Sequence, residues 1–377
     1  MFEVYITKAS RFLPNDPISN DEMDAYLGLI DGKPSKGKSL TLRNNGIKSR
    51  YYSIDKNGHS THNNAQMTAM AIQKLANGDF KLADIELIAC GTTTPDNLLP
   101  SHASMVHGEL KASPVELVSP SGACCAGMQA LKYGYMSVAS GNTKNAVCTG
   151  SEKTSSWLRS EQFEKETEKL AELEQQPLIS FEKDFLRWML SDGAGAVLLE
   201  NKPRGPVSLK IEWLEIKSFA NEIETCMYAG ADKNADGTTT GWKEMTPDEW
   251  MAHSTFALKQ DVKLLGKHIV PTGTLYLKDL LEKHKLDINT ISYFLPHLSS
   301  EFFRNKIAEE IVKYNINIPQ EKWFTNLTQL GNVGAGSVYL MIEELMNSGK
   351  LKKGDKILLM VPESARFTYA YALLTAY

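Results

Sequence analysis

The sequence has no stretch that approaches the roughly 18 consecutive apolar residues of a membrane helix. Its start, Met1–Thr7, lacks both the basic segment and the long apolar core of a signal peptide, so we interpret it as a first strand. Dense blocks of lysine and arginine are also missing, and the net charge of −4 argues against a nucleic-acid binder. We therefore expect a cytoplasmic protein that binds neither a membrane nor nucleic acid.

Cysteine is scarce, and its positions argue against a disulfide framework or a metal site. The five cysteines are odd in number and show no metal-ligand spacing. Cys124 and Cys125 are adjacent, which makes them poor candidates for a disulfide framework or a zinc site. We expect reduced thiols, no metal and no cofactor.

Strand and helix patterns alternate along the chain, which at 377 residues is long enough for two units with cores. The apolar runs Ile85–Cys90, Ala146–Cys148 and Ala194–Leu199 are typical of buried strands. This alternation favours an α/β fold in which helices cover sheets. Residues 157–184 are instead rich in glutamate and lysine, which predicts a solvated, largely helical excursion from the core.

Two parts of the sequence resemble each other. In the first, a turn of small residues ends at Ala126-Gly127, a helix follows, and a strand leads to Gly150–Glu152. In the second, a similar turn ends at Ala335-Gly336, and a helix and a strand lead to Glu363-Ser364. The match is too short to prove a duplication, but it indicates a chain built from two related halves.

The segment Pro120–Gln129 is the strongest sign of chemistry in the chain. An apolar strand pattern, Val115–Val118, precedes it and an amphipathic helix pattern follows, so both cysteines lie at a strand-to-helix turn. A thiol at a helix N-terminus is close to the positive end of the helix dipole, which favours its thiolate. The alternative is that both cysteines are small buried residues in a packing joint.

Two later segments also present polar residues at strand–helix junctions. The strand pattern Ser292–Pro296 delivers His297 into a serine-rich loop, and the glycine-rich turn of residues 325–337 presents Asn332 before a helix. Together with Cys125 these residues can converge at one sheet edge. Acyl transfer needs such a set, namely a thiolate nucleophile and neutral donors for a thioester oxygen. A satisfied loop histidine and a turn-forming asparagine remain the alternatives.

In this order and spacing, the motifs resemble the β-ketoacyl-acyl-carrier-protein synthase III family of the thiolase superfamily. The resemblance extends over nearly the whole chain, and each motif alone is weak. The motifs that carry it are Ala123–Gly127, Asn145–Glu152, Ser191–Ala196, Leu295–His297, Gly331-Asn332 and Phe367–Tyr369.

This resemblance implies an α/β thiolase fold of five layers, α-β-α-β-α, with two pseudo-symmetric halves at residues 1–200 and 201–377, and usually a homodimer. The family nucleophile precedes Ala-Gly and therefore maps onto Cys125 rather than Cys124. The family histidine follows a proline and maps onto His297, and the family asparagine follows a glycine and maps onto Asn332.

The chemistry implied by the resemblance is that of an acyltransferase of lipid or polyketide biosynthesis. Cys125 would take an acyl group from a coenzyme A or acyl-carrier-protein thioester, with backbone N–H groups holding the oxyanion. His297 and Asn332 would then hydrogen-bond the carbonyl of a second thioester while a Claisen condensation forms the carbon–carbon bond.

The sequence also departs from the family pattern. The C-terminal loop, glycine-rich in the family, reads Pro362–Arg366, in which a backbone N–H near Ala365 or Arg366 can still complete an oxyanion hole. Glu363 in this loop is either a surface carboxylate or an accessory acid or base. The adenine-stacking tryptophan expected upstream of the Arg43–Arg50 motif is absent, which favours carrier-protein donors. Leu99-Pro100 lacks the glutamate of head-to-head condensing relatives.

Leu27–Ser35, the Pro362–Arg366 loop and the charged excursion resemble one branch, the ketosynthases of dialkylresorcinol and flexirubin-type pigment pathways. This would imply joining a 3-oxoacyl thioester to an α,β-unsaturated acyl thioester and closing a dialkylcyclohexanedione ring, a dialkylresorcinol precursor. The alternative is a housekeeping β-ketoacyl-acyl-carrier-protein synthase III that initiates fatty-acid synthesis.

Other classes of protein fit less well. In papain-type Cys-His-Asn hydrolases the cysteine follows Gly-Ser near the mature N-terminus, unlike Cys125. A non-catalytic ketosynthase-like partner typically lacks the nucleophile, and a degradative thiolase needs a second cysteine late in the chain, whereas none follows Cys226.

Overall fold

The computed structural model describes residues 1–35, 37–162 and 186–377. Most of the charged excursion expected at 157–184 therefore lies outside the described residues. The main sheet has nine strands in the order β13-β14-β15-β8-β1-β7-β6-β4-β5. Its strands are β1 (Tyr5–Phe12), β4 (Leu87–Thr92), β5 (Glu116–Val118), β6 (Asn145–Glu152), β7 (Gly193–Glu200), β8 (Leu209–Ser218), β13 (Ile291–Pro296), β14 (Lys356–Glu363) and β15 (Thr368–Ala376).

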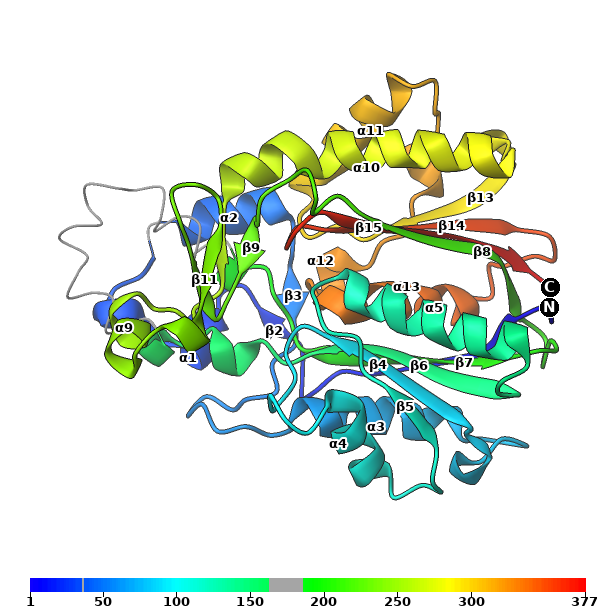
Figure 1. The fold of residues 1–377 in the computed structure, drawn as a ribbon, viewed down its shortest axis with the longest axis horizontal. Coiled ribbons are helices and arrows are strands. Elements are labelled where there is room, and N and C mark those ends of the chain that lie inside the picture. Colours follow the sequence, from blue (N-terminus) through cyan, green and yellow to red (C-terminus); the bar gives the residue numbers. More distant parts are fainter. Residues whose placement is uncertain (36, 163–185) are drawn as a thin grey trace.

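The main sheet consists of two half-sheets that join where β1 meets β8, through the residue pairs Tyr5–Lys210 and Ile6–Leu209. In Figure 1 the half-sheets form two layers with helices between them and on both outer faces. The inner layer holds α5 (Cys125–Ser140) and α13 (Ser337–Asn347); the outer layers hold α10 (Val262–His284) with α11 (Phe302–Val312), and α3 (Asn64–Leu75) with α4 (His102–Leu110). The expected five-layered α/β fold is confirmed.

Both halves have the same connectivity around their inner helix. Helix α5 leads into β6, which pairs parallel with β4 and antiparallel with β7. Helix α13 leads into β14, which pairs parallel with β13 and antiparallel with β15. The two similar stretches of sequence correspond to these units. Residue 200, where the sequence analysis divides the chain, is the last residue of β7, and we keep that division as a proposal.

Three glycines allow the start of α5 and the turn before α13 to pack closely against each other and against strands β4 and β6. A Cβ on Gly150 would lie 2.0 Å from the carbonyl oxygen of Ala335, and one on Gly127 would lie 2.3 Å from the same atom. A Cβ on Gly91 would lie 2.2 Å from the carbonyl oxygen of Ala126. The N-termini of both inner helices therefore meet between the half-sheets, where the candidate site lies.

The smaller elements are α1 (Met23–Leu27), α2 (Lys38–Asn45), α9 (Pro247–Ala252), α12 (Leu327–Leu330), β2 (Ile18–Ser19), β3 (Ser49–Arg50), β9 (Met227–Tyr228), β10 (Ala231–Lys233), β11 (Thr239–Gly241) and β12 (Lys259–Gln260). Several of the smaller elements, among them α1, α9 and β11, lie at the end of the molecule opposite the chain termini, whereas α12 lies beside α13 (Figure 1). None of the described helices is long and apolar enough to cross a membrane.

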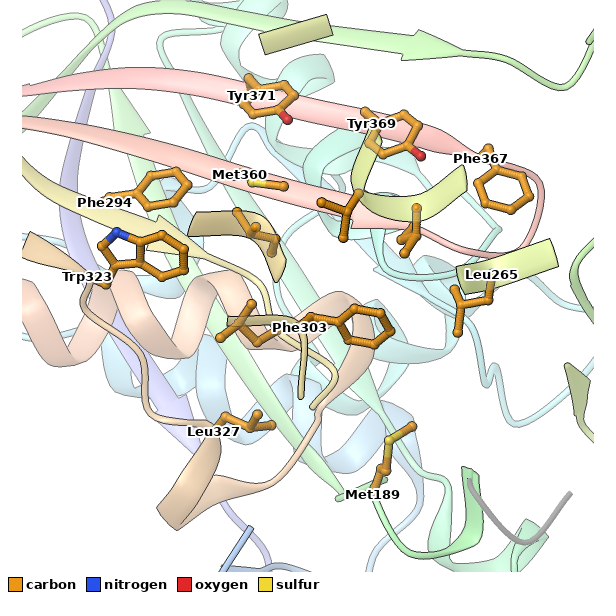
Figure 2. Close-up of a cluster of buried hydrophobic side chains, with 14 of the residues drawn as sticks. Met189, Leu265, Phe294, Phe303, Trp323, Leu327, Met360, Phe367, Tyr369 and Tyr371 are labelled. Carbon is orange, nitrogen blue, oxygen red and sulfur yellow. The ribbon is translucent and has the colours of Figure 1, made fainter. Parts of the chain in front are cut away.

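The outer helices α10 and α11 cover the second half-sheet through a continuous apolar cluster. Figure 2 shows Leu265 of α10 and Phe303 of α11 on one side, with Met360 of β14 and Tyr369 of β15 across from them. Burial of such side chains stabilises each by about 1.5–3 kcal/mol relative to full exposure. This cluster fixes the strands whose C-terminal ends carry His297 and the Pro362–Arg366 loop.

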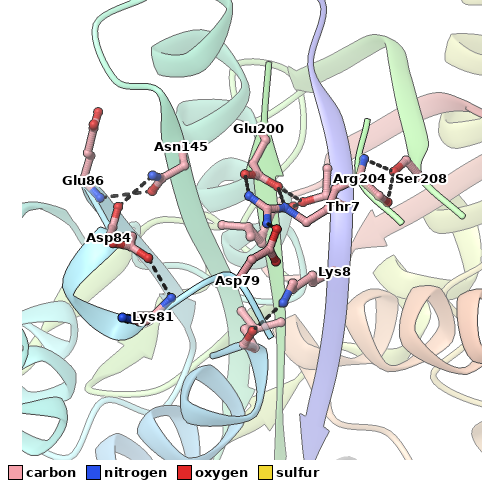
Figure 3. Close-up of polar contacts among 12 residues, drawn as sticks. Thr7, Lys8, Asp79, Lys81, Asp84, Glu86, Asn145, Glu200, Arg204 and Ser208 are labelled. Carbon is pink, nitrogen blue, oxygen red and sulfur yellow. Dashed lines mark hydrogen bonds and ion pairs between the residues drawn. The ribbon is translucent and has the colours of Figure 1, made fainter. Parts of the chain in front are cut away.

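Polar contacts tie β1 to β7 away from the candidate site. Arg204 pairs with Glu200 at 2.6 Å and also contacts Asp79, while the Thr7 hydroxyl donates to Glu200 at 2.6 Å (Figure 3). Because partly exposed ion pairs contribute little, these contacts set the strand register more than they add stability.

Candidate active site

Cys125 is the first residue of α5 and is completely buried. Its backbone N–H donates to Glu363 Oε2 at 3.0 Å. Its thiol donates to the carbonyl oxygens of Val361 at 3.3 Å and Thr368 at 3.5 Å, so the sulfur lies against the β14–β15 hairpin. The expected position of Cys125 at a strand-to-helix turn is thus observed.

The expectation of a favoured thiolate at Cys125 is wrong for this arrangement. Burial raises the pKa of the Cys125 thiol well above its ordinary value, and the negative charge of Glu363 raises it further. Burial likewise raises the pKa of the neighbouring Cys124 thiol. The helix N-terminus cannot offset these effects here, because the carboxylate of Glu363 already accepts the Cys125 N–H.

His297 directly follows β13, and its backbone N–H donates to the carbonyl oxygen of Met360 at 2.7 Å. Its side chain is 3% exposed, and neither ring nitrogen has a hydrogen-bond partner within the described part of the chain. Burial lowers the pKa of His297 to about 4, which keeps the imidazole neutral at neutral pH. A neutral imidazole retains one N–H donor, the group that a substrate carbonyl requires.

Asn332 is held by contacts on both sides of its backbone. Its N–H donates to the Met189 carbonyl oxygen at 3.1 Å, and its carbonyl oxygen accepts the Ser191 N–H at 2.9 Å. The side-chain Oδ1 accepts the Gly334 N–H at 2.9 Å. Among the described residues, no acceptor contacts the amide NH₂, which is therefore left to donate to a ligand.

Two small cavities meet beside the turn of residues 119–125 that leads from β5 into α5, which we call the cysteine turn. One, of about 40 Å³, is lined by His297 and by apolar side chains of α10, α11 and β14 that include Leu265 and Phe303. The other, of about 50 Å³, is lined by Asn332, among others. Cys124, Ser299 and Ser364 line both cavities, whereas Cys125 lines neither. The structure thus brings His297 and Asn332 to either side of Cys124. The Cys125 thiol lies outside both cavities, against the β14–β15 hairpin.

Glu363 is the last residue of β14 and is buried, with 7% of its surface exposed, so it is not a surface carboxylate. Its Oε2 accepts the N–H groups of Cys125 at 3.0 Å and Ala123 at 3.2 Å. Burial raises the pKa of Glu363, and both N–H donors partly oppose this. The exposed Arg366 forms no ion pair with it among the described residues.

The Pro362–Arg366 loop is anchored through one carbonyl group. The carbonyl oxygen of Ala365 accepts the N–H groups of Cys226 at 2.9 Å and Met227 at 3.2 Å. In the described ranges, the N–H groups of Ala365 and Arg366 donate to no protein acceptor. These two N–H groups therefore stay candidates for an oxyanion hole, as the sequence analysis expects.

The sequence analysis quoted Glu152 in a motif but assigned it no role. Glu152 is the last residue of β6 and is 1% exposed. Its carboxylate accepts the Ala335 N–H at 3.1 Å and the hydroxyls of Thr93 and Thr94 at 2.7 Å each. It thereby ties the loop after β4 to the turn before α13. The sequence offered one sign of this role, because Glu152 and Glu363 end the corresponding strands of its two similar stretches.

Arg50, at the end of the motif expected near the coenzyme A site, has a structural role. Its side chain is fully buried. It donates to Asn20 Oδ1 at 2.6 Å and to the Trp188 carbonyl oxygen at 3.3 Å. Its guanidinium is therefore not available to a coenzyme A phosphate.

Comparison with known proteins agrees with this geometry. The family described as "3-Oxoacyl-[acyl-carrier-protein (ACP)] synthase III C terminal" matches residues 281–375. Over 367 residues, 96% of both chains, the protein is 27% identical to the beta-ketoacyl-[acyl-carrier-protein] synthase III of Clostridium perfringens (strain SM101 / Type A). Over 355 residues, 94% of both chains, it is 26% identical to that of Chlorobaculum tepidum.

The C-terminal part of the chain thus matches the synthase III family, and enzymes of that name are similar to the chain over nearly its whole length. This similarity indicates an acyltransferase that resembles synthase III, of the Claisen-condensing kind. This assignment sets aside the papain-type hydrolase and the non-catalytic partner.

Solved structures confirm the thiolase fold over the full chain. AbyA1, a tetronic acid condensing enzyme, superposes with a TM-score of 0.75 at 19% identity and 99% coverage of both chains. The 3-oxoacyl-[acyl-carrier-protein] synthase III of Aquifex aeolicus gives 0.68 at 21% identity, again with 99% coverage of both chains. A variant of Xanthomonas campestris OleA with bound lauric acid and lauroyl-CoA gives 0.73 at 17% identity and the same coverage.

Proposed function

We propose that this enzyme condenses two acyl thioesters through an acyl group carried on Cys125, with His297 and Asn332 hydrogen-bonding the carbonyl of the second thioester. The buried, unpartnered imidazole of His297 is the observation that carries this proposal. Leaving a buried polar group without a partner costs about 1–3 kcal/mol. A thioester carbonyl in the cavity beside His297 would supply that partner and would gain a neutral donor as it acquires enolate character.

The narrower substrate proposal is a 3-oxoacyl thioester joined to an α,β-unsaturated acyl thioester, with closure to a dialkylcyclohexanedione. Two small cavities that meet at Cys124 support it, because two thioester groups must approach the cysteine turn from different sides. The buried carboxylate of Glu363 supports it as well, because ring closure requires a further proton transfer. We propose acyl-carrier-protein donors, which need no adenine-stacking tryptophan.

Product analysis with a panel of acyl thioesters tests the function directly. We expect cyclic diketones when a 3-oxoacyl and an α,β-unsaturated thioester are supplied together, identified by chromatography and mass spectrometry. Linear 3-oxoacyl products from every pair would instead support the housekeeping synthase that initiates fatty-acid synthesis. Absence of any condensation product, with acyl groups loaded, would contradict the proposed function.

Replacing Glu363 with glutamine is expected to retain acyl loading on Cys125 and to shift products from cyclic to linear or hydrolysed diketides. A glutamine side chain keeps an acceptor for both N–H groups but cannot move the proton that ring closure requires. A positioned carboxylate typically contributes about 10²–10⁴-fold to such a step. Chromatography of products from both proteins measures the ratio, and an unchanged cyclic-to-linear ratio excludes this role.

We also propose that the enzyme is a homodimer. The neighbouring side chains of Leu98 and Leu99 are 76% and 87% exposed, and the strand β5 lies at an edge of the main sheet. Exposed apolar pairs of this kind favour a protein contact. The double variant Leu98→Asp with Leu99→Asp should change a dimer into a 41.9 kDa monomer in light scattering after gel filtration. Leu275→Asp, a 48% exposed leucine on α10, is the control and should remain dimeric.

A further inference from the structure

Two buried glutamates occupy equivalent places in the two halves of the molecule. Glu152 ends β6 and Glu363 ends β14, the strands that follow the inner helices α5 and α13. Each carboxylate accepts backbone N–H groups from the turn before the inner helix of the other half. Glu152 accepts from Ala335 at 3.1 Å, and Glu363 accepts from Cys125 at 3.0 Å and Ala123 at 3.2 Å.

The two carboxylates differ in how firmly they are held. Glu152 also receives the Thr93 N–H at 3.1 Å and the hydroxyls of Thr93 and Thr94, so both of its oxygens are hydrogen-bonded. Glu363 receives its two N–H groups on Oε2, and in the described part of the chain no donor contacts Oε1. Glu152 is therefore a fully bonded structural link, whereas Glu363 can turn away after losing two hydrogen bonds.

The contact of Glu363 conflicts with the acylation of Cys125. When a thiolate attacks a thioester, the carbonyl oxygen becomes negative and needs preorganised N–H donors. The N–H of the nucleophile itself, at the start of α5, is such a donor, and Glu363 occupies it in this structure. An ionised carboxylate and an oxyanion cannot share that N–H, because like charges repel at this distance.

We propose that Glu363 is a positioning residue that holds the Cys125 N–H in the resting enzyme and yields it to the thioester oxygen when the acyl donor binds. This inference rests on the proposed role of Cys125 as the nucleophile. In the acylation step the Cys125 sulfur forms a bond to the carbonyl carbon, and the thioester carbon–sulfur bond breaks. The thiol proton ends on the departing thiol, and the carboxylate of Glu363 keeps its charge.

The resting contact has a consequence for reactivity. The negative charge of Glu363 adds to burial in raising the pKa of the Cys125 thiol, so the thiol stays protonated until a donor displaces the carboxylate. Because the thiolate and not the thiol is the nucleophile, Cys125 is less reactive until that displacement. The other titratable groups around the cysteine turn are Cys124, Glu152, His297, Tyr339, Tyr369 and Tyr371.

The test compares acylation across neutral and alkaline pH in three variants, E363Q, E363A and the matched control E152Q. All carry Cys124→Ala, so that only Cys125 in the turn can be loaded, and octanoyl-CoA is the probe. The rate of mass gain is read by intact-protein mass spectrometry. Removing one adjacent negative charge should lower the midpoint of the pH profile and raise acylation at neutral pH about tenfold in E363Q and E363A.

The two substitutions at Glu363 separate the effect of its negative charge from the effect of its hydrogen bond to the Cys125 N–H. Glutamine still accepts the Cys125 N–H, whereas alanine frees it, so E363A should also have a higher limiting rate at alkaline pH than E363Q. E152Q should lower the melting temperature without moving the midpoint, because Glu152 is not among the groups that raise the pKa of Cys125 and its carboxylate bonds the other turn.

An unmoved midpoint in both folded Glu363 variants, or an equal shift in E152Q, would overturn the inference. If the proposed function itself is wrong, the experiment gives a different result. In that case the parent protein with Cys124→Ala would gain no octanoyl mass on Cys125 at any pH.

Discussion

Replacing Cys125 with alanine is expected to abolish acyl loading, leaving no mass gain above background after incubation with acyl thioesters. The residue begins α5 at the turn where both inner helices meet, and its N–H is positioned to receive a developing oxyanion once Glu363 leaves. The substitution removes the sulfur that forms the covalent bond to the acyl carbon. Intact-protein mass spectrometry followed by peptide mapping measures the adduct and its position.

Cys124→Ala is the matched control and should retain substantial loading. The comparison is sharp because the two thiols are adjacent yet face different surroundings. Cys124 lines both cavities, while the Cys125 thiol donates to the carbonyl oxygens of Val361 and Thr368. Loading of Cys125 therefore requires the sulfur to leave these carbonyls when the donor enters. If Cys124→Ala gained no acyl mass while Cys125→Ala still gained it, the nucleophile would be Cys124 and not Cys125.

Much of the fold could be predicted because buried strands leave a clear pattern in the sequence. The run Ala194–Leu199 lies within β7, and the run Ile85–Cys90 overlaps β4, which is shifted by two residues. Strands buried on both faces are continuous apolar runs, and this is why they stand out. His297 follows β13 directly, as expected, because the polar residue marks the point where the apolar run ends.

The electrostatics of the site could not be predicted from local sequence. A helix N-terminus by itself favours a thiolate, yet the pKa of Cys125 is raised. The reason is a contact between Cys125 and Glu363, which are 238 positions apart in the chain. Glu152 and Ala335, 183 positions apart, form the corresponding link in the other half. Only the folded arrangement of the two halves brings each carboxylate to the opposite turn.

The connection between the halves explains why a condensing site lies where it does. Each inner helix begins at a turn of small residues, and Gly127 of α5 and Gly150 of β6 leave room for the Ala335 carbonyl group of the second turn. The first turn carries the cysteine, and the second carries Asn332 a few residues before α13. Because β13 and β14 are parallel neighbours, His297 and the loop after Glu363 lie at the same sheet edge.

His297→Ala and Asn332→Ala are expected to load acyl groups normally but to condense them about 10²–10³-fold more slowly, the usual effect of losing one oxyanion or enolate donor. Both side chains present donors that no described residue uses, one in each cavity beside Cys124. We therefore expect both residues to act on the second thioester, after the first acyl group has been transferred. Single-turnover measurements that start from the acyl-enzyme separate the two stages.

His102→Ala is the matched control for the loss of a buried imidazole. Burial lowers the pKa of His102 to about 4, as it does for His297, but the ring of His102 bonds Ser151 at 3.2 Å and lines neither cavity. Its removal should reduce thermal stability and leave the ratio of condensation to loading unchanged. If His297→Ala and Asn332→Ala lost the acyl adduct while remaining folded, both residues would instead belong to the activation of the nucleophile. Since His297 is neutral far below neutral pH, the condensation rate of the acyl-enzyme should also stay flat on mild acidification, until its protonation near pH 4 removes the neutral imidazole.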